Sequence, residues 1–208
     1  MEITNLNQLD LNGTYSFAVY LTWKFTETVE ILRGKLVAMA SPKPMHQDAV
    51  IALGSAFRAY LRDKKCRVYV ALSDVKLYNR AKSIVADRDI YTVVQPDVYV
   101  VCDLSLMRGN NTCNGAPDLV VEIVSKSTQD RDLHEKKDLY AEAGVREYWI
   151  VFTENKLVLT HLLNENGTYN NPHVYTESDH VMPYIFPDCS IDLSDVFDFP
   201  AEYDEPVI

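Results

Sequence analysis

A single carboxylate inside an apolar run constrains this chain more than any other feature. Glu122 lies within Leu119–Val124, a short run that is otherwise apolar and rich in β-branched residues. Such a pattern predicts a buried β-strand. An ionised carboxylate left without a partner in that strand would cost several kcal/mol. The fold must therefore give Glu122 a metal ion, a cationic side chain or a network of hydrogen bonds.

A second acid lies at a similar apolar segment earlier in the chain. Asp97 follows Pro96 and directly precedes the apolar run Val98–Val101. Two acids on neighbouring strands would supply the carboxylate oxygens that Mg²⁺ prefers, at a separation of about 4–6 Å when one ion bridges them. We therefore expect Asp97 and Glu122 to lie together and to face a cleft that admits solvent.

Length and composition indicate one domain. The 208 residues, of which 47% are hydrophobic, suffice for one large core but not for two. We expect a single domain over residues 1–208, with a frayed acidic tail at about 199–208. The chain has no apolar stretch long enough to span a membrane, and its start lacks the features of a secretion signal, so we expect a cytoplasmic protein.

The cysteines and the charge distribution limit the other possibilities. No CxxC pair is present, so we expect four reduced thiols and no zinc site. The cysteines are Cys66, Cys102, Cys113 and Cys189. The net charge of −10 comes from residues 157–208, which contain ten acids and no Lys or Arg. The remainder is neutral, so any surface for a nucleic acid must be local. Two candidate basic groups are residues 24–43 and 58–67, although both are also typical of ordinary solvated surface.

The order of apolar and turn segments predicts an α/β fold. We expect a short aromatic helix at 15–26, a strand pair at 28–40 that turns at Arg33 and Gly34, a helix at 45–63 and strands at 66–78 and 91–101. Residues 117–152 predict a strand, a helix closed by Gly144 and a second strand. Such a crossover joins strands of one sheet, commonly in parallel.

The predicted helix of that crossover carries a candidate partner for the acids. Lys136 lies four residues after Asp132 and four before Tyr140, so the three share one helix face. Its ammonium could point back toward Glu122 and Asp97. The alternative is an ordinary exposed lysine, since Lys137 is adjacent.

Several segments carry a more specific pattern when they are taken together. They are residues 117–128, Asp132 with Lys136 and Tyr140, residues 144–151, and upstream residues 29–34, 39–47 and 95–98, with a late segment at 181–193. Together they resemble the Uma2 family of endonucleases, which belongs to the restriction-endonuclease-like, PD-(D/E)xK superfamily. The resemblance extends from about residue 15 to residue 198.

The resemblance implies a restriction-endonuclease-like fold with a central mixed β-sheet flanked by helices. It also implies metal-dependent hydrolysis of DNA phosphodiester bonds. Asp97, Glu122 and Lys136 would be the catalytic residues, and Asp97, Glu122 and Glu30 would bind Mg²⁺ or Mn²⁺. Lys136 would position the water or stabilise charge in the transition state. We also expect a homodimer, which would present one site to each DNA strand.

Two departures from the pattern leave alternatives open. The superfamily motif places its lysine two residues after the glutamate, where this chain has Val124. Lys126 stands where the family usually has proline, so Lys126 could replace or assist Lys136. A non-catalytic nucleic-acid-binding or scaffold protein that retains the nuclease fold is one rival interpretation. A hydrolase that acts on a different phosphoester is the second.

Overall fold

The strand that carries Glu122 lies in the interior of a six-stranded sheet. The computed structural model describes residues 2–79, 85–108, 112–126, 128–200 and 203. The sheet has the order β11-β10-β9-β8-β6-β3. Its strands are β3 (Arg67–Val70), β6 (Val98–Val101), β8 (Leu119–Val124), β9 (Glu147–Phe152), β10 (Leu157–Leu162) and β11 (His173–Thr176). β8 and β9 are parallel and all other neighbours are antiparallel, which confirms the predicted mixed sheet and its crossover.

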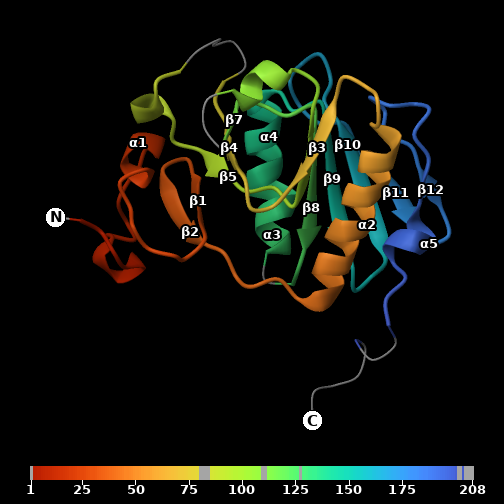
Figure 1. Ribbon diagram of the computed structural model, residues 1–208, viewed down its shortest axis with the longest axis horizontal. Helices are drawn as coiled ribbons and strands as arrows, with labels where there is room; N and C mark the ends of the chain where they lie inside the picture. Colours follow the sequence, from red (N-terminus) through yellow and green to blue (C-terminus); the bar gives the residue numbers. More distant parts are fainter. Residues whose placement is uncertain (1, 80–84, 109–111, 127, 201–202, 204–208) are drawn as a thin grey trace.

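A second sheet, of order β2-β1-β5-β4-β7, lies beside the first (Figure 1). Its strands are β1 (Val29–Leu32), β2 (Lys35–Ala38), β4 (Asp74–Lys76), β5 (Val93–Val94) and β7 (Thr112–Asn114). The predicted turn between β1 and β2 is confirmed, and both Arg33 and Gly34 have positive φ there.

The two sheets correct one expectation about the strands. Residues 66–78 and 91–101 are not two continuous strands, because each breaks in the middle and contributes one strand to each sheet. Between β5 and β6 the break falls at Gln95–Asp97, where Pro96 has no N–H to donate to a ladder. The chain therefore changes sheets at Asp97.

Helices cover both faces of the main sheet (Figure 1). On one face, α2 (Pro44–Tyr60) packs Leu53 and Phe57 against Val121 and Trp149, with α5 (Leu193–Val196) beside it. On the other face lies the crossover helix, which consists of α3 (Gln129–Arg131), a π-helical turn (Asp132–Lys136) and α4 (Lys137–Ala143). It ends, as predicted, at Gly144, whose φ of 95° is left-handed.

The rest of the described chain forms small elements. The predicted helix at 15–26 is shorter than expected, since α1 spans only Phe17–Tyr20. Three 3₁₀ turns lie at Leu6–Gln8, Asp87–Asp89 and Leu104–Met107, and β12 (His180–Val181) pairs with β13 (Ile191–Asp192). Most of the predicted acidic tail falls outside the described residues. No helix in the described ranges is both long and apolar enough to cross a membrane.

Alternation along β8 places Glu122 on the side of the crossover helix. Val121 and Ile123 belong to the core cluster that contains α2. Val120 and Val124 belong to the other cluster, with Leu139 and Tyr140. Because successive side chains of a strand point to opposite faces, Glu122 points toward the face that α4 covers. The whole strand is buried.

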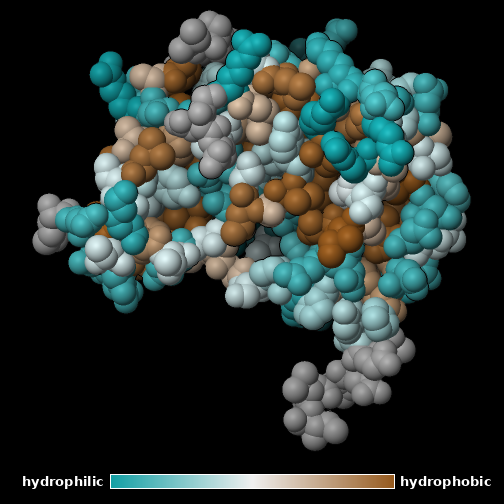
Figure 2. All heavy atoms as spheres, viewed as in Figure 1, coloured by the Kyte–Doolittle hydropathy of each residue, from teal (hydrophilic) through white to brown (hydrophobic). Residues whose placement is uncertain are grey.

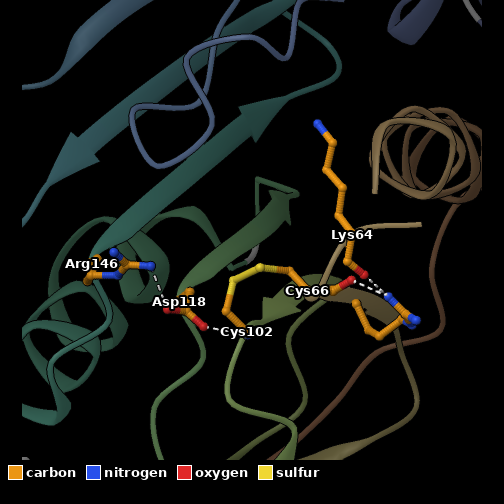
Figure 3. Close-up of a disulfide and its surroundings, with 6 residues drawn as sticks. Lys64, Cys66, Cys102, Asp118 and Arg146 are labelled. Atoms are coloured by element: carbon orange, nitrogen blue, oxygen red, sulfur yellow. Dashed lines mark hydrogen bonds and ion pairs between the residues drawn. A yellow bond between two sulfur atoms is a disulfide. The ribbon is translucent and has the colours of Figure 1, made fainter. Parts of the chain in front are cut away.

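The expectation of four reduced thiols is wrong for two of the cysteines. Cys66 and Cys102 form a disulfide (Figure 3), whereas Cys113 and Cys189 are free and buried. Cys66 precedes β3 and Cys102 follows β6, and the antiparallel register that pairs Arg67 with Val101 brings them opposite each other. They are 36 residues apart in sequence, so only the strand pairing brings them together.

The disulfide should contribute measurably to stability. Replacing both Cys66 and Cys102 by serine should lower the free energy of unfolding by about 4 kcal/mol, because the link closes a long loop in the unfolded chain. Urea unfolding of the oxidised protein and of the variant measures the difference. A reductant should destabilise the wild type and leave the variant unchanged. Equal stability of the two proteins would contradict the prediction.

Candidate active site

A buried lysine stands at the centre of the candidate site. The Nζ atom of Lys136 lies 2.8 Å from Oε1 of Glu30, 3.0 Å from Oε1 of Glu122 and 3.8 Å from Oδ1 of Asp132. The side chains of all four residues are at most 6% exposed. Glu30 comes from β1 and Glu122 from β8, so the lysine joins the two sheets.

The π-helical turn shapes the helix at this point. Asp132 and Lys136 are its first and last residues, and both are buried. A π-helical turn inside an α-helix widens the backbone locally and is frequent at functional sites. The sequence predicted the shared face of Asp132, Lys136 and Tyr140 but gave no signal for the altered winding.

Tyr140 is a further member of the site. Its hydroxyl donates a hydrogen bond of 2.5 Å to Oε1 of Glu122, the same oxygen that contacts Lys136. Burial, and then the charge of Glu122, raise the pKa of Tyr140 well above its ordinary value, so the hydroxyl stays protonated and keeps donating. The spacing Asp132, Lys136, Tyr140 marked this residue, although sequence reasoning gave it no role.

Asp97 lies next to this cluster and has its own partners. The register that pairs Val98 with Val121 places Asp97 beside Glu122, and Oδ2 of Asp97 accepts a hydrogen bond of 2.7 Å from the backbone N–H of Ile123. His46, at the start of α2, brings its Nε2 to 3.2 Å from the same oxygen.

His46 and Asp97 form the solvent-facing side of the cluster. Their side chains are 21% and 11% exposed, more than those of Lys136 and Glu122. Burial lowers the pKa of His46, but the hydrogen bond to Asp97 and its charge more than offset this, so the pKa is raised. His46 lies in the segment 39–47 of the resemblance, but its contact with Asp97 comes from tertiary packing.

Glu30 is held by a network that extends into the second sheet. Its Oε1 accepts a hydrogen bond of 2.9 Å from the backbone N–H of Gln95, as well as the contact from Lys136. The Gln95 side chain donates to Oδ1 of Asp74, and Tyr20 contacts the same oxygen. Glu30 therefore serves as a partner of Lys136, and its part in metal binding stays a prediction.

The cluster carries more negative than positive charge. One ammonium faces the carboxyl groups of Glu30, Glu122 and Asp132, with Asp97 alongside. Burial raises the pKa of Glu122 well above its ordinary value, and the neighbouring acids add to this, although Lys136 opposes it. The acids in turn raise the pKa of Lys136 despite its burial, so the lysine stays charged. A buried excess of carboxylates favours a further cation.

The residues fit a divalent ion through two carboxylates. Within the described ranges, no three His, Cys, Asp or Glu side chains are already arranged to hold a metal. Mg²⁺, however, is often bound by one or two carboxylates, with water and substrate phosphate as its other ligands. The hydrogen bonds of the described chain use only Oδ2 of Asp97 and Oε1 of Glu122, which leaves one oxygen on each.

The alternative lysines lie outside this cluster. Lys126 pairs with Glu154 at 2.8 Å, and its side chain is 85% exposed. Lys137 is half-buried and begins α4. Of the three candidates, Lys136 alone contacts the carboxylates, while its role in a reaction stays a prediction.

Removing the ammonium should destabilise the fold in a pH-dependent way. Lys136→Met should lower the free energy of unfolding by about 3–5 kcal/mol at neutral pH, because Glu122, Glu30 and Asp132 lose their buried cation. The variant should also raise the pKa of Glu122 further, since Lys136 lowers it in the wild type. Between the pKa of Glu122 in the folded wild type and its higher pKa in the folded variant, only the variant holds this proton, so the deficit should shrink as pH falls through that range.

Urea unfolding between about pH 5 and pH 8 measures this deficit. Titration of Lys136 itself does not change the stability of the wild type in that window, because its raised pKa keeps the side chain charged throughout. Lys137→Met removes the same charge from the adjacent, half-buried position and is the control. A deficit no larger than that of Lys137→Met would contradict the assignment.

Comparison with known proteins identifies the family and the fold. Residues 18–194 match the Uma2 family, described as "Putative restriction endonuclease". A crystal structure from Anabaena variabilis ATCC 29413, described as a "putative nuclease belonging to DUF820", superposes with a TM-score of 0.68 at 17% identity. The match covers 88% of this chain and 97% of that chain, and it shows the same fold. No curated protein matches. Since the family match spans most of the sequence, the chain belongs to the Uma2 family.

Proposed function

We propose that this protein is a metal-dependent endonuclease that hydrolyses phosphodiester bonds of DNA. The supporting observation is the buried excess of carboxylates around one lysine, with Asp97 beside Glu122 on the solvent-facing side of the cluster. Membership of a family described as restriction endonucleases agrees with this proposal. Asp97 and Glu122 would hold Mg²⁺ or Mn²⁺, and Glu30 would complete the ligand set or hold the lysine.

The chain's own residues have distinct roles in this proposal. When bound, the metal would acidify a water molecule and polarise the phosphate. The Lys136 ammonium stabilises charge that develops on the phosphate or orients the attacking water. Tyr140 fixes the Glu122 carboxylate through its hydrogen bond, and Glu30 and Asp132 hold the lysine in place.

A non-catalytic scaffold is the second candidate. Val124 in the usual lysine position and the near-complete burial of Lys136 favour it. The scaffold interpretation requires no metal, whereas every enzymatic version does. A hydrolase of another phosphoester would share the metal requirement and differ only in substrate.

A cytoplasmic location is also part of the proposal, because a nuclease acts where it can reach DNA. The Cys66–Cys102 disulfide argues against a reducing cytoplasm, because disulfides persist mainly in oxidising compartments. The proportion of disulfide in protein isolated from its own cell, with thiols trapped at lysis, would decide the matter.

Removing one carboxylate charge should abolish cleavage. Glu122→Gln keeps the shape and an oxygen for Tyr140 and Lys136, but it removes the charge that holds the metal. Duplex or branched DNA with Mg²⁺ or Mn²⁺ should be cut slowly by the wild type, not by Glu122→Gln or Asp97→Asn, and EDTA should stop the reaction. Asp118→Asn is the control, because Asp118 also follows a proline but pairs with Arg146 at the surface. No cleavage by the wild type across substrates and metals would favour the scaffold.

Metal binding separates ligands from other residues of the site. Calorimetric titration with Mn²⁺ should show binding to the wild type and a loss of at least about tenfold in affinity for Asp97→Asn, because a ligand charge is lost. Lys136→Ala should bind Mn²⁺ nearly as well as the wild type while cleaving more slowly, since a lysine ammonium has no acceptor atom for a metal. Equal Mn²⁺ affinity of the wild type and Asp97→Asn would contradict the ligand assignment.

The protein should form a symmetric dimer. Cutting both strands of a duplex needs two sites, and twofold symmetry is the commonest way to present them. The aromatic segment at 15–26 and the acidic C-terminal segment are the expected contacts. Sedimentation velocity at micromolar concentration should give twice the monomer mass of 23.7 kDa. A strict monomer would contradict the dimer and leave nicking of single strands as the activity.

A further inference from the structure

The C-terminal end of α2 carries a group of arginines that the candidate active site does not use. A cavity of about 410 Å³ opens there, and Arg58, Arg62 and Arg67 line it together with Ser55 and Asp63. Figure 2 shows hydrophilic residues gathered over this end of the helix. Within residues 58–67, five Lys and Arg side chains accompany a single acid, in a chain whose net charge is −10.

These arginines are positioned but not neutralised by the protein. Arg67 is fixed, because its Nη1 donates to the carbonyl oxygens of Lys64 and Cys66, and the disulfide anchors Cys66 to β6. Figure 3 shows that the Lys64 side chain points away from the disulfide, and its Nζ lies 3.1 Å from the centre of the Tyr60 ring. Among the described residues, the arginines that form ion pairs are Arg33, Arg88 and Arg146, and none of these lines the cavity.

Three guanidinium groups and one carboxylate, that of Asp63, line the cavity, so its net charge is positive and attracts an anion. Guanidinium groups bind phosphate oxygens through paired hydrogen bonds, which makes phosphate the anion that this set fits best. Arg58 in the last turn of α2 and Arg62 just beyond it are both exposed and line the same cavity.

The cavity and the candidate active site lie at opposite ends of α2. His46, near the start of the helix, contacts Asp97. The helix rises about 18 Å between His46 and Arg58, and that distance corresponds to about five base pairs of duplex DNA. The exposed positions between them on one helix face are Gln47, Ile51 and Ser55, none of which is acidic. In Figure 1, α2 runs along the near face of the main sheet between these two ends.

We propose that the Arg58, Arg62 and Arg67 cavity binds a backbone phosphate of duplex DNA that lies along α2, about five base pairs from the cleaved bond. This inference rests on the proposed function, and it identifies a surface that binds the DNA away from the bond that is cut. The cavity lies far from the predicted metal ligands, so it contributes to binding and not to the chemical step.

The test measures DNA binding apart from cleavage. A fluorescent duplex of about 30 base pairs is titrated with protein in EDTA, at several salt concentrations, and anisotropy is recorded. Arg58→Gln/Arg62→Gln should bind about tenfold more weakly than the wild type near 0.1 M salt, and the slope of log K against log salt should fall by about one, because one phosphate contact is lost. Arg88→Gln/Arg108→Gln removes the same charge from two exposed arginines outside both candidate basic groups and should change neither quantity.

The cleavage reaction supplies the second measurement. The arginine variant should raise KM and leave kcat unchanged, because it removes binding that is equal in the ground and transition states. If the wild type binds DNA without cutting it, and the arginine variant still binds more weakly, the nuclease proposal fails and the binding surface stands. If the arginine variant cuts and binds DNA as well as the wild type does, the binding surface is wrong and the nuclease proposal stands.

Three further outcomes would overturn the inference. The first is failure of the wild type to bind the duplex. The second is an equal loss in the Arg88→Gln/Arg108→Gln control, which would assign the effect to total charge. The third is a variant that binds DNA normally but no longer self-associates, which would assign the cavity to a second copy of the chain. Matching thermal unfolding of all variants excludes misfolding as the cause.

Discussion

The contact between one buried ammonium and three carboxyl groups determines how the rest of the structure can be assembled. Lys136 bridges Glu30 of one sheet and Glu122 of the other, with Asp132 from its own helix. Burying Glu30, Glu122 or Lys136 without the others would leave an unpaired charge, which is costly. The two sheets and the crossover helix must therefore come together at one point, and the candidate active site lies at that point.

The same arrangement limits how stable the molecule can be. An apolar cluster of similar volume would often be at least as stabilising as buried ion pairs. The excess of negative charge and the unusual helical turn at Asp132–Lys136 add to the cost. Such features are typical of sites that sacrifice stability for binding or catalysis. Extensive apolar packing of α2 and α4 on the main sheet offsets this cost.

The sequence predicted the parts of this fold that depend on local pattern. The apolar run around Glu122, the crossover helix ending at Gly144 and the turn at Arg33 each follow from residue type and spacing, and the structure confirms them. The division of residues 66–78 and 91–101 between two sheets was not predictable, because a break in pairing depends on distant strands. The Cys66–Cys102 disulfide was missed for the same reason, since only the β3–β6 register brings the thiols together. The spacing from Asp132 and Lys136 marked Tyr140, but the contacts of Tyr140 and of His46 depend on tertiary packing.

The chain order of the cluster has a consequence for how the protein is made. Glu30 lies on the second strand layer and is synthesised early, whereas Lys136 comes much later and reaches Glu30 only when the layers dock. A partly folded or truncated chain therefore lacks the assembled carboxylate group, even if its main sheet has formed. Any chemistry that needs all of these groups therefore requires both layers to be packed against each other.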